Sequence, residues 1–347
     1  MIDINANRKL YKDLLRIISA FGVIIGHCAG PVVYDFTTAS GRWITADIYA
    51  SLIRFSVPVF FMISGSIFLD PKLQKYDKMP KKNLSRLGIA FAFWSVVYLL
   101  FRMFYLKREY ADIYTILGAL FEGNHHLYFL WFLSIIYLAV PLLRKITSDK
   151  KKTEYFLLFS FIFFIFLRFI VNLPFFDFLS DTFSNISLSM SIGFAFHFVA
   201  GYYFDSAELK ARTRKLIYAC GFLCAAIIAF GTYYFSKEGG EYKDWFLNNI
   251  SPFCAVLGIA VFVFVRECFK DKDFSEKSYK TIVFISSLTF GIYLSHELFT
   301  KIAEQTGIFD ALPTVVSIPA EAAAVFVVSA VLTFVLSKIP LIGKYIV

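Results

Sequence analysis

The chain has 347 residues, of which 58% are hydrophobic and only 18% are charged. A soluble core cannot bury that much apolar surface, whereas a lipid bilayer can, so the composition excludes an ordinary soluble protein. The formal net charge of +9 does not indicate a nucleic-acid partner, because the positive residues lie in short clusters between apolar stretches and form no basic domain.

Apolar segments recur ten times along the chain, each about as long as the 20 residues that a helix needs to cross a bilayer. They lie at 12–33, 48–69, 86–106, 127–147, 154–173, 187–205, 215–236, 248–268, 281–302 and 315–338. If the N-terminus is cytoplasmic, the cytoplasmic side holds 26 of the 35 Lys and Arg residues, as the positive-inside rule requires. The sequence therefore predicts an all-α, polytopic membrane protein, a bundle of about ten transmembrane helices with both termini cytoplasmic.

The loops between these segments are short, and they contain no Gly/Ser-rich linker. We therefore expect residues 1–347 to form a single transmembrane domain. The five cysteines lie in or beside apolar segments, without the His or Cys spacing of a zinc site. No metal site is predicted on that basis.

The first segment carries ionisable residues, which are costly inside a bilayer and commonly mark functional sites. Arg16 and His27 are eleven residues apart, so a helix places them within about 20° of one direction and separates them by roughly 16 Å along its axis. Asp13 is three residues before Arg16 and can pair with it. A positive-inside anchor would explain Arg16 alone, and a packing histidine would explain His27 alone. Their shared helix face favours a joint function.

Further polar residues recur in the outer halves of later segments. They are Arg54 in the second, Glu122, His125, His126 and Trp131 at the start of the fourth, Arg168 in the fifth, and His296 and Glu297 in the ninth. With His27, five helices contribute at one depth, which predicts a polar cavity that opens outward. Taken singly, Glu122, His125 and Glu297 fit solvated positions near the membrane surface.

On the cytoplasmic side, Lys82 and Arg86 stand at the entrance of the third segment. Their position fits a positive-inside anchor. It also fits a phosphate-binding mouth beside Arg16, because Arg and Lys bind phosphate oxygens by charge-assisted hydrogen bonds.

Several stretches resemble the integral membrane acyltransferase family known as acyltransferase 3. The first helix, YKDLLRIISAFGVIIGH (11–27), is similar to the opening of that family, in which Asp13, Arg16 and His27 follow in this order. The later resemblances are FSVPVFFMISGSIFL (55–69), KKNLSRLGIAFAFW (81–94), HLYFLWFLSIIYLAVPLL (126–143) and LTFGIYLSH (288–296). Together they are spread over most of the chain.

The resemblance implies an O-acyltransferase in a bacterial inner or plasma membrane. Such an enzyme would move an acyl group, typically acetyl, from a cytoplasmic acyl-CoA to a hydroxyl of an extracytoplasmic cell-envelope glycan or glycolipid. Acetyl-CoA would be a substrate and not a permanently bound cofactor. His27 would correspond to the essential histidine of the family and Arg16 to its paired basic residue. The oligomeric state stays open.

A mechanism follows as a hypothesis, with His27 as general base and a covalent acyl-His27 as the second possibility. Donor phosphates would be bound by Arg16, Arg86 and Lys82. The acceptor or the oxyanion would be held by Arg54, His126, Arg168 or His296, with Asp13, Trp131 and Glu122 in support. The alternative function is a secondary transporter of an acidic or sugar-like solute. Against it, no segment is predicted to be broken at its middle, and Pro58 is the nearest to such a break.

Overall fold

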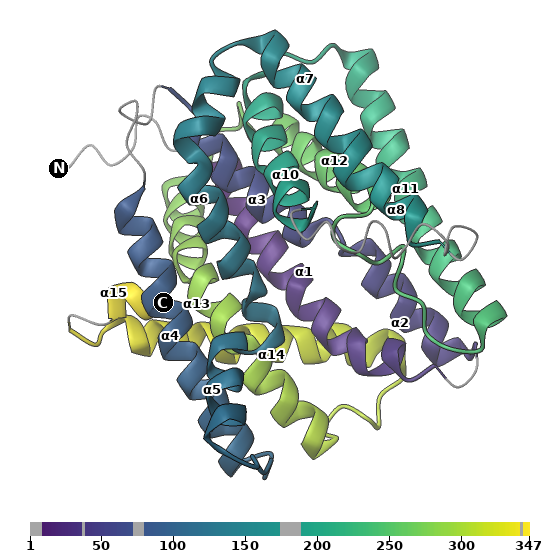
Figure 1. Cartoon of the computed structure of the whole chain (residues 1–347), viewed down its shortest axis with the longest axis vertical. Coiled ribbons are helices and arrows are strands. Elements are labelled where there is room, and N and C mark those ends of the chain that lie inside the picture. The colour runs from purple at the N-terminus through teal and green to yellow at the C-terminus, as the bar shows by residue number, and fades with distance from the viewer. Residues whose placement is uncertain (1–8, 37–38, 72–79, 174–188, 341–342) are drawn as a thin grey trace.

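The computed structural model describes residues 9–36, 39–71, 80–173, 189–340 and 343–347. Within these ranges the regular elements are all helices (Figure 1). In chain order they are α1 (Leu10–Tyr34), α2 (Gly41–Leu52), α3 (Ser56–Phe68), α4 (Lys81–Phe104), α5 (Ile113–Glu122), η1 (His125–Leu127), α6 (Tyr128–Thr147), α7 (Lys150–Ser160), η2 (Phe161–Phe166), α8 (Leu167–Val171), α10 (Ser189–Ser206), α11 (Ala211–Gly239), α12 (Pro252–Phe269), α13 (Glu276–Thr306), α14 (Thr314–Ser337) and α15 (Gly343–Ile346).

In the described ranges, nine helical segments are long and apolar enough to cross a bilayer. They coincide with nine of the ten expected segments. The remaining one, 187–205, coincides with α10, although its first two residues lie outside the described residues. The prediction of an all-α polytopic membrane protein is therefore confirmed, whereas the cytoplasmic position of both termini stays a prediction. The short helices α5 and α15 were not expected, because neither is long enough to form an apolar segment.

The second membrane segment differs from the continuous helix expected at 48–69. It consists of α2 and α3, joined by a turn at residues 53–55. Pro58 accounts for the break, because proline has no N–H and its ring clashes with the carbonyl group four residues earlier, at Arg54. The expectation that no segment is broken at its middle is thus wrong. The break places Arg54 in the turn rather than on a helix face.

The central helix of the bundle is α1, which packs against α13, α2, α3 and α14 (Figure 1). It runs parallel to α13. Near its beginning, Ser286 Oγ of α13 donates a hydrogen bond to Asp13 Oδ1 at 2.7 Å, and nearer its end His27 lies beside Glu297 of α13. Below, the two ends of the bundle are named the Arg16 end, where α1 begins, and the His27 end, where α1 finishes.

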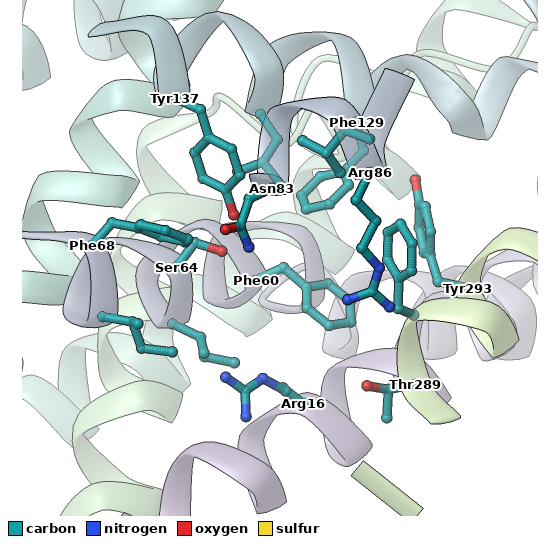
Figure 2. A pocket seen from close by; sticks show the side chains of 15 residues that line it. Arg16, Phe60, Ser64, Phe68, Asn83, Arg86, Phe129, Tyr137, Thr289 and Tyr293 are labelled. Carbon is teal, nitrogen blue, oxygen red and sulfur yellow. The ribbon is translucent and has the colours of Figure 1, made fainter. Parts of the chain in front are cut away.

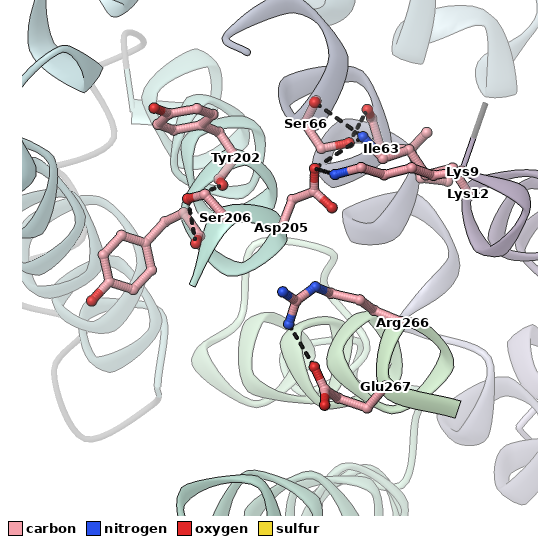
Figure 3. Close-up of polar contacts among 10 residues, drawn as sticks. Lys9, Lys12, Ile63, Ser66, Tyr202, Asp205, Ser206, Arg266 and Glu267 are labelled. Atoms are coloured by element: carbon pink, nitrogen blue, oxygen red, sulfur yellow. Dashed lines mark hydrogen bonds and ion pairs between the residues drawn. The ribbon is translucent and has the colours of Figure 1, made fainter. Parts of the chain in front are cut away.

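A buried ion network joins α1, α3 and α10 at the Arg16 end, and an ion pair within α12 lies beside it (Figure 3). Lys12 Nζ lies 3.0 Å from Asp205 Oδ2 and donates to the carbonyl oxygen of Ser66 at 3.1 Å. Beside this pair, Arg266 Nη1 lies 2.6 Å from Glu267 Oε1. Removing one partner would leave a buried charge uncompensated, which is strongly destabilising. The network therefore holds the helices around α1 at one end of the bundle.

Helices α3 and α10 approach each other closely at two glycines. A Cβ on Gly65 would lie 1.7 Å from the carbonyl oxygen of Phe198, and one on Gly201 would lie 1.9 Å from that of Met62. Small residues permit such approach between membrane helices. We expect Gly65→Ala to lower the free energy of unfolding by roughly 3 kcal/mol, the upper range for overpacking.

The measurement is the yield and thermal melting of purified protein in detergent. Gly88→Ala on α4 is the matched control, because a Cβ there meets no atom of the described residues within 4 Å. If Gly65→Ala melts at the same temperature as Gly88→Ala, the close approach of α3 and α10 is contradicted.

Candidate functional site

Two cavities lie at different heights along the same two helices, α4 and α13. The Arg16 cavity, of about 290 Å³, is lined from α1, α3, α4, α6 and α13. The His125 cavity, of about 400 Å³, is lined from the last turns of α4, the end of α5, the following residues up to η1, and α13. Helix α4 contributes Arg86 to the first and Arg102 to the second, and it rises roughly 24 Å between them. The cavities therefore lie toward opposite ends of the bundle.

In the Arg16 cavity, Arg16 and Arg86 point into one space from opposite sides (Figure 2). Arg16 Nη1 lies 2.8 Å from Asp13 Oδ1, and Asp13 is itself only 1% exposed. Arg86 stacks on the ring of Phe290, 4.6 Å from the ring centroid, and donates to the main-chain oxygen of Val347. Two guanidinium groups that face one cavity can bind a phosphate or a carboxylate.

The other residue expected at this mouth, Lys82, is exposed and does not line the cavity. Asn83, which follows it on α4, lines the cavity instead. Asn83 was not among the expected residues, because a neutral amide at the start of a helix carries no distinctive signal in the sequence.

At the His27 end, four histidines meet. The centroid of the His27 ring lies 4.9 Å from that of His296, 5.2 Å from that of His125 and 6.2 Å from that of His126. His27 Nδ1 also lies 3.1 Å from Glu297 Oε2. The structure thus brings His27, His126 and His296 together, as their common depth in the sequence predicts. We call these four histidines and Glu297 the histidine cluster.

Glu297 is a correction to the sequence analysis. It was expected with the other outer-half residues around a polar cavity and, taken singly, in a solvated position, but it is 3% exposed and faces His27. The signal for a buried position was already in the sequence, because Glu297 lies inside an apolar segment next to His296. A carboxylate within a membrane-spanning segment is by default a functional candidate.

Arg16 and His27 lie on the same face of α1, as their spacing predicts. Both face α13. Arg16 lines a cavity together with Thr289 of α13, and His27 contacts Glu297 further along the same helix. The face of α1 that meets α13 therefore connects the Arg16 cavity with the histidine cluster.

Two histidines of the cluster have a buried ring nitrogen without a partner among the described residues. His126 Nδ1 lies 3.2 Å from Asn124 Nδ2, and His296 Nδ1 lies 2.6 Å from the carbonyl oxygen of Tyr293. An amide nitrogen donates and a carbonyl accepts, so His126 carries its proton on Nε2 and His296 on Nδ1. Both Nε2 atoms are buried without a partner among the described residues. Of these two buried atoms, Nε2 of His126 is therefore a donor and Nε2 of His296 is an acceptor.

The histidine cluster separates the two cavities. Tyr293 lines the Arg16 cavity, and its ring centroid lies 5.7 Å from that of His126 and 5.8 Å from that of His296. Its hydroxyl donates to the carbonyl oxygen of His126. On the other side of the cluster, His125 and Glu297 line the His125 cavity. A reactive group of a ligand bound in either cavity can therefore approach the histidine cluster.

The same cluster contains a set of atoms that could hold a metal ion. The ligand atoms of His27, His296 and Glu297 all lie within 4.8 Å of one another. The expectation of no metal site rests on the spacing of the cysteines, and none of these three ligands is a cysteine. The absence of a metal therefore stays a prediction.

The remaining sequence candidates lie elsewhere. Arg54, in the turn between α2 and α3, and Arg168, on α8, line neither cavity. Trp131 is 47% exposed on the outside of α6, where it packs on Phe91. Only Glu122 joins the site, as part of the His125 cavity. Common depth in a membrane could not distinguish these residues, because depth does not specify the direction in which a side chain points.

The chain matches the family model of acyltransferase 3, described as an acyltransferase domain, over residues 10–338. This range includes all the residues that line the two cavities and all the members of the histidine cluster. Val347, whose main-chain oxygen accepts the hydrogen bond from Arg86, lies beyond it. Comparisons with curated proteins and with solved structures give no match. From the match over nearly its whole length, together with its membrane-spanning helices, the chain is a membrane-embedded member of the acyltransferase 3 family.

Proposed function

We propose that this membrane acyltransferase moves an acyl group, acetyl in the simplest case, from cytoplasmic acyl-CoA to a hydroxyl of an extracytoplasmic cell-envelope glycan or glycolipid. Its location would be a bacterial inner or plasma membrane. The observation that carries the proposal is the position of the histidine cluster between two cavities at opposite ends of the bundle. Such an arrangement lets a donor and an acceptor from different compartments meet at one base.

The donor enters the Arg16 cavity. Arg16 and Arg86 bind its phosphates by charge-assisted hydrogen bonds. Its flexible thioester arm then follows the apolar wall formed by Phe60 and Phe129 toward Tyr293. Lys82, which lies outside the cavity, contributes only a long-range attraction for the phosphates.

In the transfer step, the acceptor hydroxyl gives its proton to Nε2 of His27 while its oxygen attacks the thioester carbonyl carbon. The tetrahedral intermediate then collapses. The C–S bond breaks, the CoA sulfur takes the proton from His27, and the new ester C–O bond remains. General base catalysis of this kind needs a neutral imidazole that can accept a proton near neutral pH.

Two neighbours assist His27. Glu297, beside Nδ1, keeps the ring proton on that nitrogen and stabilises the imidazolium that forms. The free Nε2–H of His126 is the donor available for the oxyanion of the intermediate, a role that His296, with its free acceptor, cannot take in this tautomer.

The transporter alternative has one observation in its favour. The break in the second membrane segment, between α2 and α3, is an interruption of the kind that binds solutes in transporters. However, residues 53–55 line neither cavity, and the family of the chain is one of acyltransferases. Acyl transfer is therefore the function that we propose.

The test uses the purified chain in lipid vesicles with labelled acetyl-CoA on the Arg16 side and a fraction of cell-envelope glycan on the other. Release of free CoA that depends on both the protein and the glycan is the expected result. Solute counterflow without CoA release would overturn the proposal in favour of transport.

Glu297 acts as a positioning residue. We expect Glu297→Gln to lower kcat roughly tenfold, because a tenfold change corresponds to the free energy that one hydrogen bond to a charged group contributes. The KM for acyl-CoA should stay unchanged. Glu297→Asp should recover part of the rate, because the carboxylate is retained. Glu276→Gln is the control, since Glu276 is exposed on the same helix, pairs with exposed Lys280 and lines neither cavity. An equal loss in Glu297→Asp and Glu297→Gln would argue against positioning through the carboxylate.

A further inference from the structure

We infer that the His125 cavity binds the acceptor by an anionic group, held by Arg102 and Arg108. The inference rests on the proposed function and narrows its acceptor to a saccharide that carries a carboxylate or a phosphate. Neither arginine belongs to the histidine cluster, and neither has a part in the transfer step.

Five charged side chains line this cavity. They are Arg102, Arg108, Lys301, Glu122 and Glu297. Glu297 lies against His27, and Lys301 Nζ lies 2.6 Å from Glu304 Oε2 outside the cavity. Among the residues that line the cavity, Arg102 and Arg108 are therefore the charges left to attract a ligand, and Glu122 is the charge that opposes them.

The partners of Arg102 are neutral. Its Nε donates to the carbonyl oxygen of Tyr98 at 3.3 Å, and its Nη2 lies 3.5 Å and 3.4 Å from the carbonyl oxygens of Ala119 and Gly123. These contacts are long, and among the described residues Arg102 makes no ion pair. They orient the guanidinium but leave its charge uncompensated, so an anion can still bind it.

Arg108 is held next to Arg102 by an unusual turn. Lys107 has φ of 52°, a conformation that residues other than glycine rarely adopt. The turn is closed by the amide N–H of Arg108, which donates to the carbonyl oxygen of Arg102 at 2.9 Å. The only contact that Arg108 makes through its guanidinium in the described structure is with the ring of Tyr110, 5.9 Å from the centroid. The turn therefore brings a second guanidinium, exposed and without an ion pair among the described residues, to the same cavity.

The same cavity reaches the histidine cluster. It contains His125, whose ring centroid lies 5.2 Å from that of His27. A volume of about 400 Å³ lies within the range of ordinary ligand pockets, about 300–1,000 Å³. One ligand can thus place a hydroxyl near His27 and an anionic group on the two arginines. A neutral sugar would offer these two guanidinium groups no charge-assisted hydrogen bond.

The experiment measures equilibrium binding to the purified full chain in lipid nanodiscs, without donor. The probes are labelled glucose, glucuronate and glucose 1-phosphate. We expect at least one anionic probe to bind about tenfold more tightly than glucose, because the free energy of one charge-assisted hydrogen bond corresponds to about a tenfold change in Kd. Preference for glucuronate identifies a carboxylate as the recognised group, and preference for glucose 1-phosphate identifies a phosphate.

The preference should fall to near equality in Arg102→Gln and Arg108→Gln. It should persist in Arg42→Gln, because Arg42 is an exposed cation of α2 outside both cavities. Unchanged acyl-CoA binding at the other end of the bundle shows that each variant is folded. Equal binding of all three probes by the parent protein, or an anion preference that survives the loss of both arginines, would overturn the inference.

Transfer of label from acyl-CoA is measured separately with the same three probes. If the anion preference is present in binding but no probe or envelope glycan ever receives the label, the proposed function fails and the anion site stands. If label passes equally to glucose and to the anions, and they bind equally, the proposed function stands and the anion site fails.

Discussion

His27→Ala is expected to lower the rate of acyl transfer about 10²- to 10⁴-fold, which is the usual contribution of a general base. Binding of acyl-CoA should be unchanged, because His27 does not line the Arg16 cavity. The side chain contacts Glu297 and three other histidines, so its loss removes the only cluster member on α1.

The measurement is single-turnover transfer of label from acyl-CoA in vesicles. Ile18→Ala is the control on the same helix, because Ile18 is exposed on the outside of α1. Acid quenching of the parent protein in the absence of acceptor distinguishes the two possible roles of His27, which are general base and covalent carrier of the acyl group. Label retained on the parent but absent from His27→Ala would indicate a covalent acyl-His27, whereas a His27→Ala protein that transfers at the parental rate would remove His27 from the mechanism.

Weakening either arginine of the Arg16 cavity is expected to raise the KM for acyl-CoA roughly 10- to 100-fold, as the loss of a charge-assisted hydrogen bond predicts. The kcat should change little, because the phosphates lie far from the reacting carbon. Arg16→Lys is preferable to alanine, since lysine can still pair with buried Asp13 while it loses the planar fork of the guanidinium. At Arg86, glutamine is the corresponding change.

Lys145→Ala is the control for these variants, because Lys145 is exposed near the end of α6 at the same end of the bundle and lines neither cavity. Rates are compared over a range of acyl-CoA concentrations. An unchanged dependence on acyl-CoA in both Arg16→Lys and Arg86→Gln would show that the donor phosphates bind elsewhere.

The residues of the site differed in how well they could be predicted. Arg16 and His27 were predictable together, because both lie on one helix and its period alone relates them. Arg54 and Arg168 were not distinguishable from His126 and His296, because all four share a depth and only packing decides which of them face one another. Arg54 was displaced further by the break that Pro58 causes before α3.

By itself, the sequence determined the membrane-spanning helices and the face of α1 that carries Arg16 and His27. Both follow from local chemistry, because lipid requires long apolar segments and a helix has a constant period. The tertiary structure alone decided that Glu297 faces His27, and that one cavity lies on each side of the histidine cluster. Those contacts join residues up to 270 positions apart (27 to 297), and they depend on how α1, α4 and α13 pack, which no local pattern specifies.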